Sequence, residues 1–404
     1  MTEHRLGAFP WPVCLALLAV AAITRIPVVL LAAGAALAAW GVSAFTARTA
    51  LRGLVVSCAV SPERLVAGET CLVRIVIANR KPLPMPWLDL RLTLPDGIGP
   101  VPAPAGVPRV SVGAGFSPRA HERVTLTFAL RVGERGAYAL GPLRLRSGDW
   151  LGFTQVEATI DAAPTIIAYP VPLNVVDRHR PSLRPLAESA TKRGLLPDPL
   201  RFRGVREHRS GDPRKEIHWK ASARLGDLQT KVYEPATSQD AIFLLNVATY
   251  DQFWIQADPE EMEIVVSATA ELVRLAAASG RQIGLVTNGL DNLTHQRPRS
   301  ALGRGPRPMT RTLEILARLG PYAAAAPEDV FLRERGRLPF GATLICVTPR
   351  LPSGLAIALL ALRRSHHRVL AVSIEAPDDA VRARLRAADV TVDALRYGAR
   401  RAAV

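Results

Sequence analysis

The densest group of ionisable side chains in the sequence lies between Phe202 and Arg224. It contains one aspartate that arginines surround, Asp212, and two histidines, His208 and His218. A histidine and a carboxylate in one cleft can exchange protons with a substrate, which is the chemistry of general acid–base catalysis. The histidines lack the close spacing and the carboxylate neighbours of a metal site, so we expect them to form hydrogen bonds within a loop.

Asp212 can also be the centre of an ion-paired loop. Guanidinium groups hold a carboxylate ionised and bind it with two parallel hydrogen bonds, and the candidates are Arg206, Arg209, Arg214 and Arg224. Trp219 either buries its ring or stacks beneath Arg224. Three roles stay open for the segment: an ion-paired clamp between two domains, a surface that binds an anion or a partner, and the catalytic site of an unrecognised hydrolase.

The ion-paired clamp is the favoured role, because acidic residues alternate with the basic ones, but the net charge of the segment also fits the second role. Residues 178–231 hold fourteen Lys and Arg against six Asp and Glu, a net charge of +8, which is half of the +16 carried by all 404 residues. Such a segment attracts acidic lipid, nucleic acid or an acidic protein. Few aromatic residues lie among these charges, so nucleic acid is the least favoured of the three.

A longer motif runs through the same stretch: an Arg-rich strand, Gly-Asp, a gap to Arg, Ile-x-Trp, Ser-Ala-Arg and a later Lys-x-Tyr-Glu. This motif resembles the signature of the bacterial family called domain of unknown function 58, and a second match runs from Arg135 to Phe153. We take the following residues of the motif as a binding or structural signature: Arg206, Gly211, Asp212, Arg214, Trp219, Lys220, Ser222, Arg224, Lys231, Tyr233 and Glu234.

The resemblance implies a membrane hairpin, a sandwich domain and a C-terminal domain similar to a von Willebrand factor A domain. It also implies a partnership with a MoxR-type AAA+ ATPase. Domains of the von Willebrand type often bind Mg²⁺ through Asp-x-Ser-x-Ser after their first strand, because Mg²⁺ prefers oxygen ligands. The corresponding residues here are Asn246, Ala248 and Tyr250. We therefore expect neither a metal ion nor another cofactor.

The elements around these residues follow from periodicity. After residue 240, buried strands at 241–245, 283–287, 344–348 and 369–374 alternate with helices at 262–276, 309–319, 354–365 and 378–388, which predicts a doubly wound α/β sheet. The Arg- and Pro-rich stretch from Gln296 to Pro308 is expected to be a loop. Residues 54–169 alternate with period two between Gly and Pro breaks, which predicts an antiparallel β-sandwich.

Two apolar runs precede the sandwich, Leu6–Thr24 and Ile26–Thr46, and a helix needs about 20 such residues to cross a bilayer. They predict a transmembrane helical hairpin whose tip lies near Pro27, with Gly34, Ala35, Ala38 and Ala39 as a small-residue face between the helices. Arg5, Arg48 and Arg52 flank its two ends and Arg25 alone marks its tip, which predicts cytoplasmic termini and cytoplasmic soluble domains. A cleaved signal peptide is the alternative for the first run.

These elements divide the chain into a hairpin at 1–50, a sandwich at 51–172, the basic signature segment at 173–239 and the α/β domain at 240–404. The four cysteines (Cys14, Cys58, Cys71 and Cys346) are too few for a disulfide framework, and no phosphate-binding loop or nucleophile elbow occurs. We expect a plasma-membrane, non-enzymatic adaptor or scaffold. The alternatives are a module that binds anions (acidic lipid or nucleic acid) through the basic segment, and the hydrolase. The oligomeric state cannot be derived from the sequence.

Overall fold

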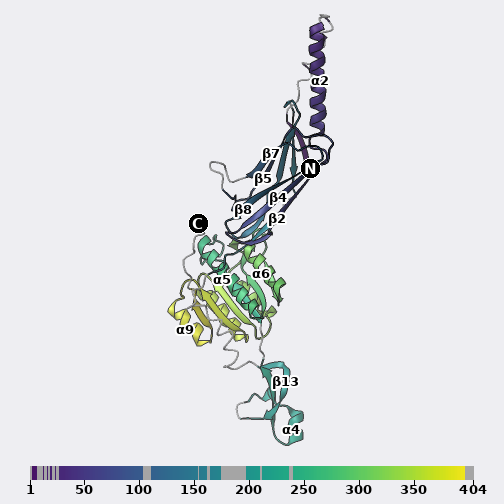
Figure 1. The fold of residues 1–404 in the computed structure, drawn as a ribbon. Helices are drawn as coiled ribbons and strands as arrows, with labels where there is room; N and C mark the ends of the chain where they lie inside the picture. The colour runs from purple at the N-terminus through teal and green to yellow at the C-terminus, as the bar shows by residue number, and fades with distance from the viewer. Residues whose placement is uncertain are drawn as a thin grey trace. The chain divides into compact units, whose positions relative to one another are not determined.

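The computed structural model contains two compact units, Met1–Val171 and Pro172–Val404, which we describe separately (Figure 1). It describes residues 2–395 except for 7–11, 13–15, 17–18, 21–22, 24–26, 103–110, 153, 162–163, 174–196, 210–211 and 236–239. Both units combine to give a mixed α/β protein with several sheets and one N-terminal apolar helix, so the mixed fold class is confirmed.

The apolar helix of the first unit is α2 (Pro27–Thr49), which begins at the proline expected to open it. It contains an 18-residue window of mean hydropathy 2.0, and among the described helices it alone is long and apolar enough to cross a membrane. Large side chains such as Leu31, which is 74% exposed, cover its outer surface. The first half of the predicted hairpin, Leu6–Thr24, lies largely outside the described residues.

The buried stripe of α2 differs from the face that the spacing of small residues predicts. Gly34, Ala35 and Ala38 are exposed, whereas Ala33 and Ser43 are fully buried. The four-residue spacing of small residues occurs on more than one face of this Ala-rich helix. Because the first apolar run lies largely outside the described residues, the small-residue face between two helices stays a prediction.

Lys81 joins α2 to the domain that follows it. Its Nζ donates hydrogen bonds to the carbonyl oxygens of Thr49 (2.7 Å) and Ala50, which close the C-terminal end of the helix. Ala47 and Leu51 lie in the hydrophobic core of the same unit. The helix therefore continues directly into the packed domain.

Three sheets form the rest of the first unit. The first has the order β1 (Thr2–Leu6), β11 (Gln155–Ile160), β10 (Leu143–Gly148), β5 (Leu88–Thr93) and β7 (Ser111–Phe116). The second has the order β2 (Leu54–Ser61), β4 (Thr70–Asn79), β8 (Arg123–Val132) and β6 (Ile98–Pro100). The third has the order β3 (Arg64–Val66), β12 (Thr165–Tyr169) and β9 (Gly136–Ala139). Pairing is antiparallel throughout except between β3 and β12.

Alternate residues of these strands enter one hydrophobic core. In β4, for example, Cys71, Val73, Ile75 and Ile77 are buried. Strands of the first sheet contribute Leu88, Leu90 and Leu92 from β5 to the same cluster. The period-two pattern of the sequence therefore corresponds to strands with one buried face.

The second unit begins with a two-stranded antiparallel hairpin of β13 (Pro197–Glu207) and β14 (Gln229–Pro235). Pro197 pairs with Pro235 at one end and Glu207 with Gln229 at the other. The connection at the second end carries a 3₁₀ turn, η2 (Arg214–Glu216), and the short helix α4 (Trp219–Leu225). We call residues 197–235 the signature arm and residues 208–228 its tip (Figure 1).

The six-stranded sheet of the second unit has the order β18 (Arg299–Gly303), β16 (Gln282–Thr287), β15 (Asp240–Leu245), β20 (Thr343–Thr348), β21 (Arg368–Ser373) and β22 (Thr391–Ala394). Its strands are parallel except β18. The helices are α5 (Pro259–Ala278), α6 (Pro306–Arg318), α7 (Pro327–Glu334, followed by η3, Arg335–Arg337), α8 (Ser353–Arg364) and α9 (Asp379–Ala387). A separate pair joins β17 (Gly289–Asp291) to β19 (Leu319–Ala323).

The stretch from Gln296 to Pro308 is not a loop, which corrects the expectation from its composition. Residues 299–303 form β18, and α6 begins at Pro306. Arg297 and Arg299 both pair with the buried carboxylate of Glu334 at the end of α7 (3.6 and 3.3 Å). The arginines that suggested a solvated loop therefore hold the edge of the sheet to a helix.

Candidate functional site

The signature arm is held together by a charged clamp at Asp212. Arg206 donates two parallel hydrogen bonds to the carboxylate, Nη1 to Oδ2 and Nη2 to Oδ1, each 2.7 Å long. The backbone N–H of Arg209 (3.0 Å) and the hydroxyl of Thr230 (3.2 Å) donate to the same carboxylate. One residue therefore ties β13, the start of the tip and β14 together.

These donors have a chemical consequence for Asp212. The hydrogen bond from Arg206, with the backbone N–H of Arg209, holds the pKa of the carboxyl well below its usual range. A carboxylate with so low a pKa does not accept protons near neutral pH. Among the described arginine side chains, only that of Arg206 pairs with Asp212. Three of the four guanidinium groups expected around the carboxylate, those of Arg209, Arg214 and Arg224, therefore do not bind it.

The two histidines form hydrogen bonds within the arm, as expected. His208 Nδ1 lies 2.9 Å from Thr230 Oγ1, and His218 Nδ1 accepts from the backbone N–H of Ala221 (3.0 Å) at the start of α4. Ser222 donates its hydroxyl to the carbonyl of His218 (3.1 Å) and accepts from the N–H of Gln229 (2.8 Å). The predicted signature residues Asp212 and Ser222 thus fix the backbone of the tip.

The remaining signature residues are distributed differently. Trp219 is 69% exposed, so the expectation that it buries its ring is wrong. Arg214, Lys220 and Arg224 are also exposed. Lys231, Tyr233 and Glu234 belong to β14, where Tyr233 pairs with Phe202, and Gly211 lies outside the described residues.

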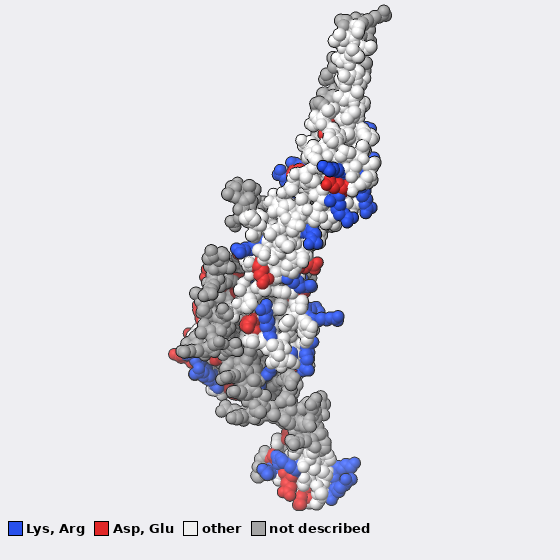
Figure 2. All heavy atoms as spheres, in the orientation of Figure 1, with Lys and Arg blue, Asp and Glu red and all other residues white. Residues whose placement is uncertain are grey.

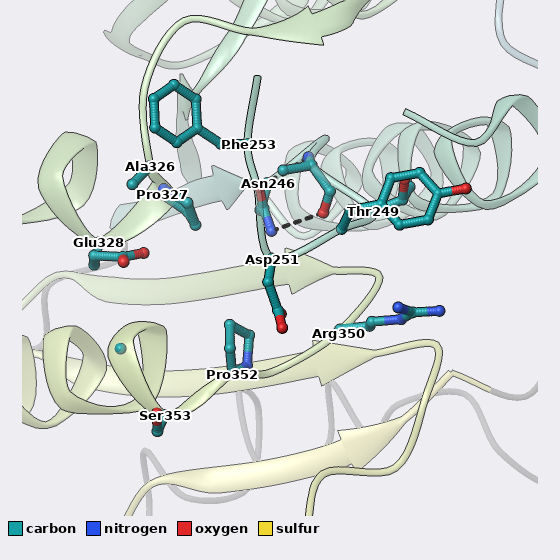
Figure 3. Close-up of a pocket in the computed structure, with 13 residues that line it drawn as sticks. Asn246, Thr249, Asp251, Phe253, Ala326, Pro327, Glu328, Arg350, Pro352 and Ser353 are labelled. Carbon is teal, nitrogen blue, oxygen red and sulfur yellow. Dashed lines mark hydrogen bonds between the residues drawn. The ribbon is translucent and has the colours of Figure 1, made fainter. Parts of the chain in front are cut away.

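A second candidate site is a hollow of about 270 Å³ at the carboxyl ends of the parallel strands (Figure 3). Three segments surround it: the loop after β15, the start of α7 and the residues before and within the start of α8. The residues that line it are Asn246, Ala248, Thr249, Tyr250, Asp251, Phe253, Ala326, Pro327, Glu328, Arg350, Pro352, Ser353 and Gly354. This edge of an open α/β sheet is where such folds bind ligands.

Asn246, the residue at the predicted degenerate metal position, is buried and uses both atoms of its amide within the protein. Its Oδ1 accepts from Ala248 N (3.0 Å) and Asn288 Nδ2 (2.8 Å), and its Nδ2 donates to Thr348 Oγ1 (3.0 Å). Asn288 in turn accepts from the backbone N–H of Val247 (2.9 Å). These side chains therefore position the loop that follows β15.

Charged groups line the sides of the hollow. Asp251 extends into it in Figure 3, while Glu328 enters from the start of α7. Arg350 pairs with Glu375 (3.1 Å) and Glu261 (3.7 Å), so carboxylates of the protein already neutralise its guanidinium group. Burial raises the pKa of Glu261, and the nearby Arg350 offsets part of this effect. In the described part of the chain no three His, Cys, Asp or Glu side chains are grouped as metal ligands.

Beside the hollow, the loop after β15 and the strand β19 present large side chains to solvent. We call Tyr250, Trp254, Ile255 and Tyr322 the aromatic rim, and their exposed fractions are 43, 67, 43 and 48%. Trp254 packs edge-to-face on Phe253 (5.2 Å between centroids), and Tyr322 donates its hydroxyl to Gln256 (3.3 Å). Sequence reasoning missed this rim, although three aromatic residues within five positions after a buried strand were a visible signal.

Comparison with known proteins confirms the family suggested by the motif. Residues 204–381 match the family described as protein of unknown function DUF58. A curated relative, the uncharacterized protein YeaD of Bacillus subtilis (strain 168), is 25% identical over 247 residues, which are 59% of this chain and 57% of the relative. The chain thus spans little more than half the length of this relative.

Similar solved structures include a von Willebrand factor type A protein from Catenulispora acidiphila, with 14% identity and a TM-score of 0.28 over 42% of this chain and 40% of that one. A CARDB domain of a Pyrococcus furiosus protein, solved with two metal ions, has 11% identity and a TM-score of 0.18, and the match covers 28% of this chain and 91% of that one. At such TM-scores these likenesses do not identify the fold.

Proposed function

We propose that this chain, whose residues 204–381 belong to the DUF58 family, is a membrane-anchored, non-enzymatic adaptor or scaffold. The observation that carries the proposal is the edge of the α/β sheet. There the polar groups of Asn246 and Asn288 bind one another and the backbone, while the neighbouring aromatic rim faces solvent. A surface on which these two amides are satisfied and large aromatic side chains are exposed suits binding of a protein better than catalysis.

The hydrolase alternative receives little support from the signature arm. General acid–base catalysis needs a carboxyl whose pKa lies near the working pH. Asp212 has the opposite property, because Arg206 and Arg209 hold it ionised. Nδ1 of His218 accepts a hydrogen bond from the backbone N–H of Ala221 and so caps α4. The arm therefore has the properties of a structural clamp that presents a surface.

For the partner we propose a MoxR-type AAA+ ATPase, on the family resemblance, docked on the aromatic rim. Removing large side chains at the centre of an interface typically costs more than 1 kcal/mol of binding free energy for each important residue. The rim offers two such side chains on one loop, Tyr250 and Trp254. Replacing both with alanine leaves the sheet and its core untouched, because neither ring belongs to the buried cluster.

Crosslinking and copurification from native membranes test the partnership. The parent chain should recover an AAA+ ATPase, and the Tyr250→Ala/Trp254→Ala variant should recover at least fivefold less. A matched control is Ile357→Ser, which changes an exposed apolar residue on α8 (53% exposed) and should recover as much ATPase as the parent. Recovery of no ATPase by the parent, or equal recovery by the rim variant, would count against the proposal.

We further propose that the anchor is a two-helix hairpin with both ends on one side of the membrane. β1, which precedes the apolar residues, pairs with β11 in the first unit, and α2 leads into β2 of the same unit. Both ends of the segment between them therefore belong to one folded domain. If α2 crosses a bilayer, the chain must cross a second time, and the apolar run Leu6–Thr24 is the segment available for it.

The flanking arginines support a cytoplasmic location for that domain, so we propose a multi-pass plasma-membrane protein with cytoplasmic termini. Labelling of single cysteines in intact cells tests the topology. A cysteine placed at Thr24 or Arg25 should react with a membrane-impermeant maleimide from outside, and one placed at Thr2 should not. Reaction at Thr2 from outside would exclude the cytoplasmic orientation, and a cleaved N-terminus would exclude the hairpin.

For the second unit we propose that the six-stranded sheet is doubly wound, with helices on both of its faces. Ile242 and Leu244 of β15 lie in one buried cluster with residues of α7, α8 and α9. The intervening Phe243 is fully buried but does not belong to that cluster, and α5 contacts β15, β16 and β20. Helices on both faces would bury both sets of side chains.

A further inference from the structure

The tip of the signature arm has little interior of its own. The buried side chains of the tip and of the strand end beside it are Ile217, Ser222, Gln229 and Thr230, of which three are polar. Hydrogen bonds of Ser222 and the Asp212 clamp, rather than apolar packing, hold the tip in shape. Apolar side chains of the tip are therefore available to an outside partner.

Three large apolar side chains of the tip are exposed on and just after α4. Trp219 is 69% exposed, Leu225 60% and Leu228 48%. Gly226, in the left-handed region with φ +83°, ends the helix between the two leucines. A Trp and two Leu on so small an element are more apolar surface than solvent contact favours.

Cations accompany these side chains. Five basic residues of the tip are exposed, and within the described part of the chain none of them has an ion-pair partner: Arg209, Arg214, Lys215, Lys220 and Arg224. Glu216 and Asp227 add negative charge to the same tip, and Figure 2 shows red and blue side chains together on this arm. Since Arg206 binds Asp212, the tip keeps a positive balance toward solvent.

We propose that the tip of the signature arm binds the surface of an anionic bilayer, with Trp219 and Leu225 entering the interface and Lys220 and Arg224 contacting lipid headgroups. Tryptophan and leucine beside lysine and arginine is the composition of interfacial membrane-binding segments. Basic residues near such a surface add electrostatic attraction to the anionic headgroups. The apolar helix α2 supports this occupant, because a chain anchored in a bilayer keeps lipid at high local concentration.

The proposal reaches beyond the adaptor function, because it concerns a surface that the aromatic rim does not include. An acidic protein is the other occupant that the charge would admit. Such a partner would use Lys220 and Arg224 in the same way, but it would not respond to lipid composition. Lipid composition is therefore the variable that the experiment changes.

The experiment uses the full chain in nanodiscs of phosphatidylcholine, with Ala223→Cys on α4 labelled by an environment-sensitive nitrobenzoxadiazole dye. Ala223 is an exposed residue of α4. Protein-free vesicles of phosphatidylcholine, with or without phosphatidylglycerol, are then added. We expect emission to rise roughly twofold with the anionic vesicles and not with the neutral ones. The labelled parent chain gives the background from the four native cysteines.

Two variants separate the charge from the apolar contribution. Lys220→Glu/Arg224→Glu should abolish the rise, while Arg384→Glu/Arg386→Glu, the same charge change on exposed positions of α9, should keep it. Trp219→Ser/Leu225→Ser should reduce it, while Ile357→Ser should not. No rise with anionic vesicles, as an acidic protein partner predicts, or an equal rise with neutral vesicles, would overturn the proposal. So would unchanged emission in either tip variant.

Discussion

At the scale of single residues, replacing Asn246 tests how much the hydrogen bonds of its side-chain amide, at the edge of the hollow, stabilise the protein. In Asn246→Asp the amide group that donates to Thr348 is lost, and a carboxylate replaces it at a position that is 3% exposed. We expect the free energy of unfolding to fall by about 2–4 kcal/mol, because a buried charge and an unsatisfied acceptor both destabilise. Denaturant titration measures the change. Asn292→Asp, the same change at an exposed residue, should cost less than about 0.5 kcal/mol; equal costs would contradict this account.

Asn246 also leads to a prediction about metal binding. Its Oδ1 already accepts two hydrogen bonds, and the residues at the other two positions of the expected metal motif are Ala248 and Tyr250. Purified protein should therefore contain no stoichiometric Mg²⁺ by elemental analysis, and adding Mg²⁺ should leave the melting temperature unchanged. One Mg²⁺ per chain that disappears in Asn246→Ala would refute the prediction.

His367 predicts a pH dependence of stability. It is 3% exposed, and burial lowers its pKa below the ordinary value of 6.5. The unfolded chain therefore binds a proton more readily than the folded one, so stability from this group is complete above pH 6.5 and decreases as the pH falls below it. When the pH is lowered from 7.5 to 5.5, the melting temperature should decrease less in His367→Gln than in the parent. An exposed histidine of the same unit provides the control, since His295→Gln should retain the parent's decrease in melting temperature.

The Asp212 clamp could be predicted from the sequence in part, whereas the hollow could not. Arg206 and Asp212 lie six positions apart, so their ion pair was one of the four that spacing allowed, whereas the partner of His208, Thr230, lies 22 positions further along the chain. The hollow combines residues such as Tyr250, Glu328 and Ser353, which about 100 positions of sequence separate. Such a site depends on which strands become neighbours, and residue spacing does not contain that information.

At the scale of elements, Lys81 makes α2 depend on the sandwich. In Lys81→Met the carbonyls of Thr49 and Ala50 lose their donor at the end of the helix. We expect the free energy of unfolding of the first unit to fall by about 1–2 kcal/mol. Thermal unfolding of the full chain in nanodiscs measures it. Arg80→Met removes a neighbouring exposed charge and should have little effect; if it destabilises as much as Lys81→Met, the capping role is wrong.

Among the elements, long periodic segments were predicted and short ones were not. Buried strands such as 241–245 and helices such as 262–276 became β15 and α5, because their hydrophobic pattern extends over most of their length. β18 was predicted to be a loop from the Arg- and Pro-rich composition around it. In the structure Arg297, just before the strand, and Arg299, within it, pair with Glu334 at the end of α7, a contact that composition does not show. α7 has eight residues, too few for a helical period to stand out.

At the scale of the whole molecule, charge and hydrophobicity are segregated along the chain. The apolar excess lies in residues 6–46 and half of the net charge in residues 178–231. Average composition therefore describes neither unit. Half of the excess positive charge behind the basic pI lies in the signature segment, where Arg206 and Asp212 form an ion pair.

The separation into units predicts that the α/β domain folds by itself. All six strands of its sheet and the buried cluster that joins α7, α8 and α9 to that sheet lie between residues 240 and 395. A fragment of residues 240–404 should therefore unfold cooperatively on heating, with a midpoint within about 5 °C of one transition of the full chain, because a domain with its own core keeps its stability when separated. Calorimetry and near-ultraviolet circular dichroism measure both. A fragment with native-like helix content but a broad, non-cooperative transition would show that the domain needs the signature arm or the first unit to complete its core.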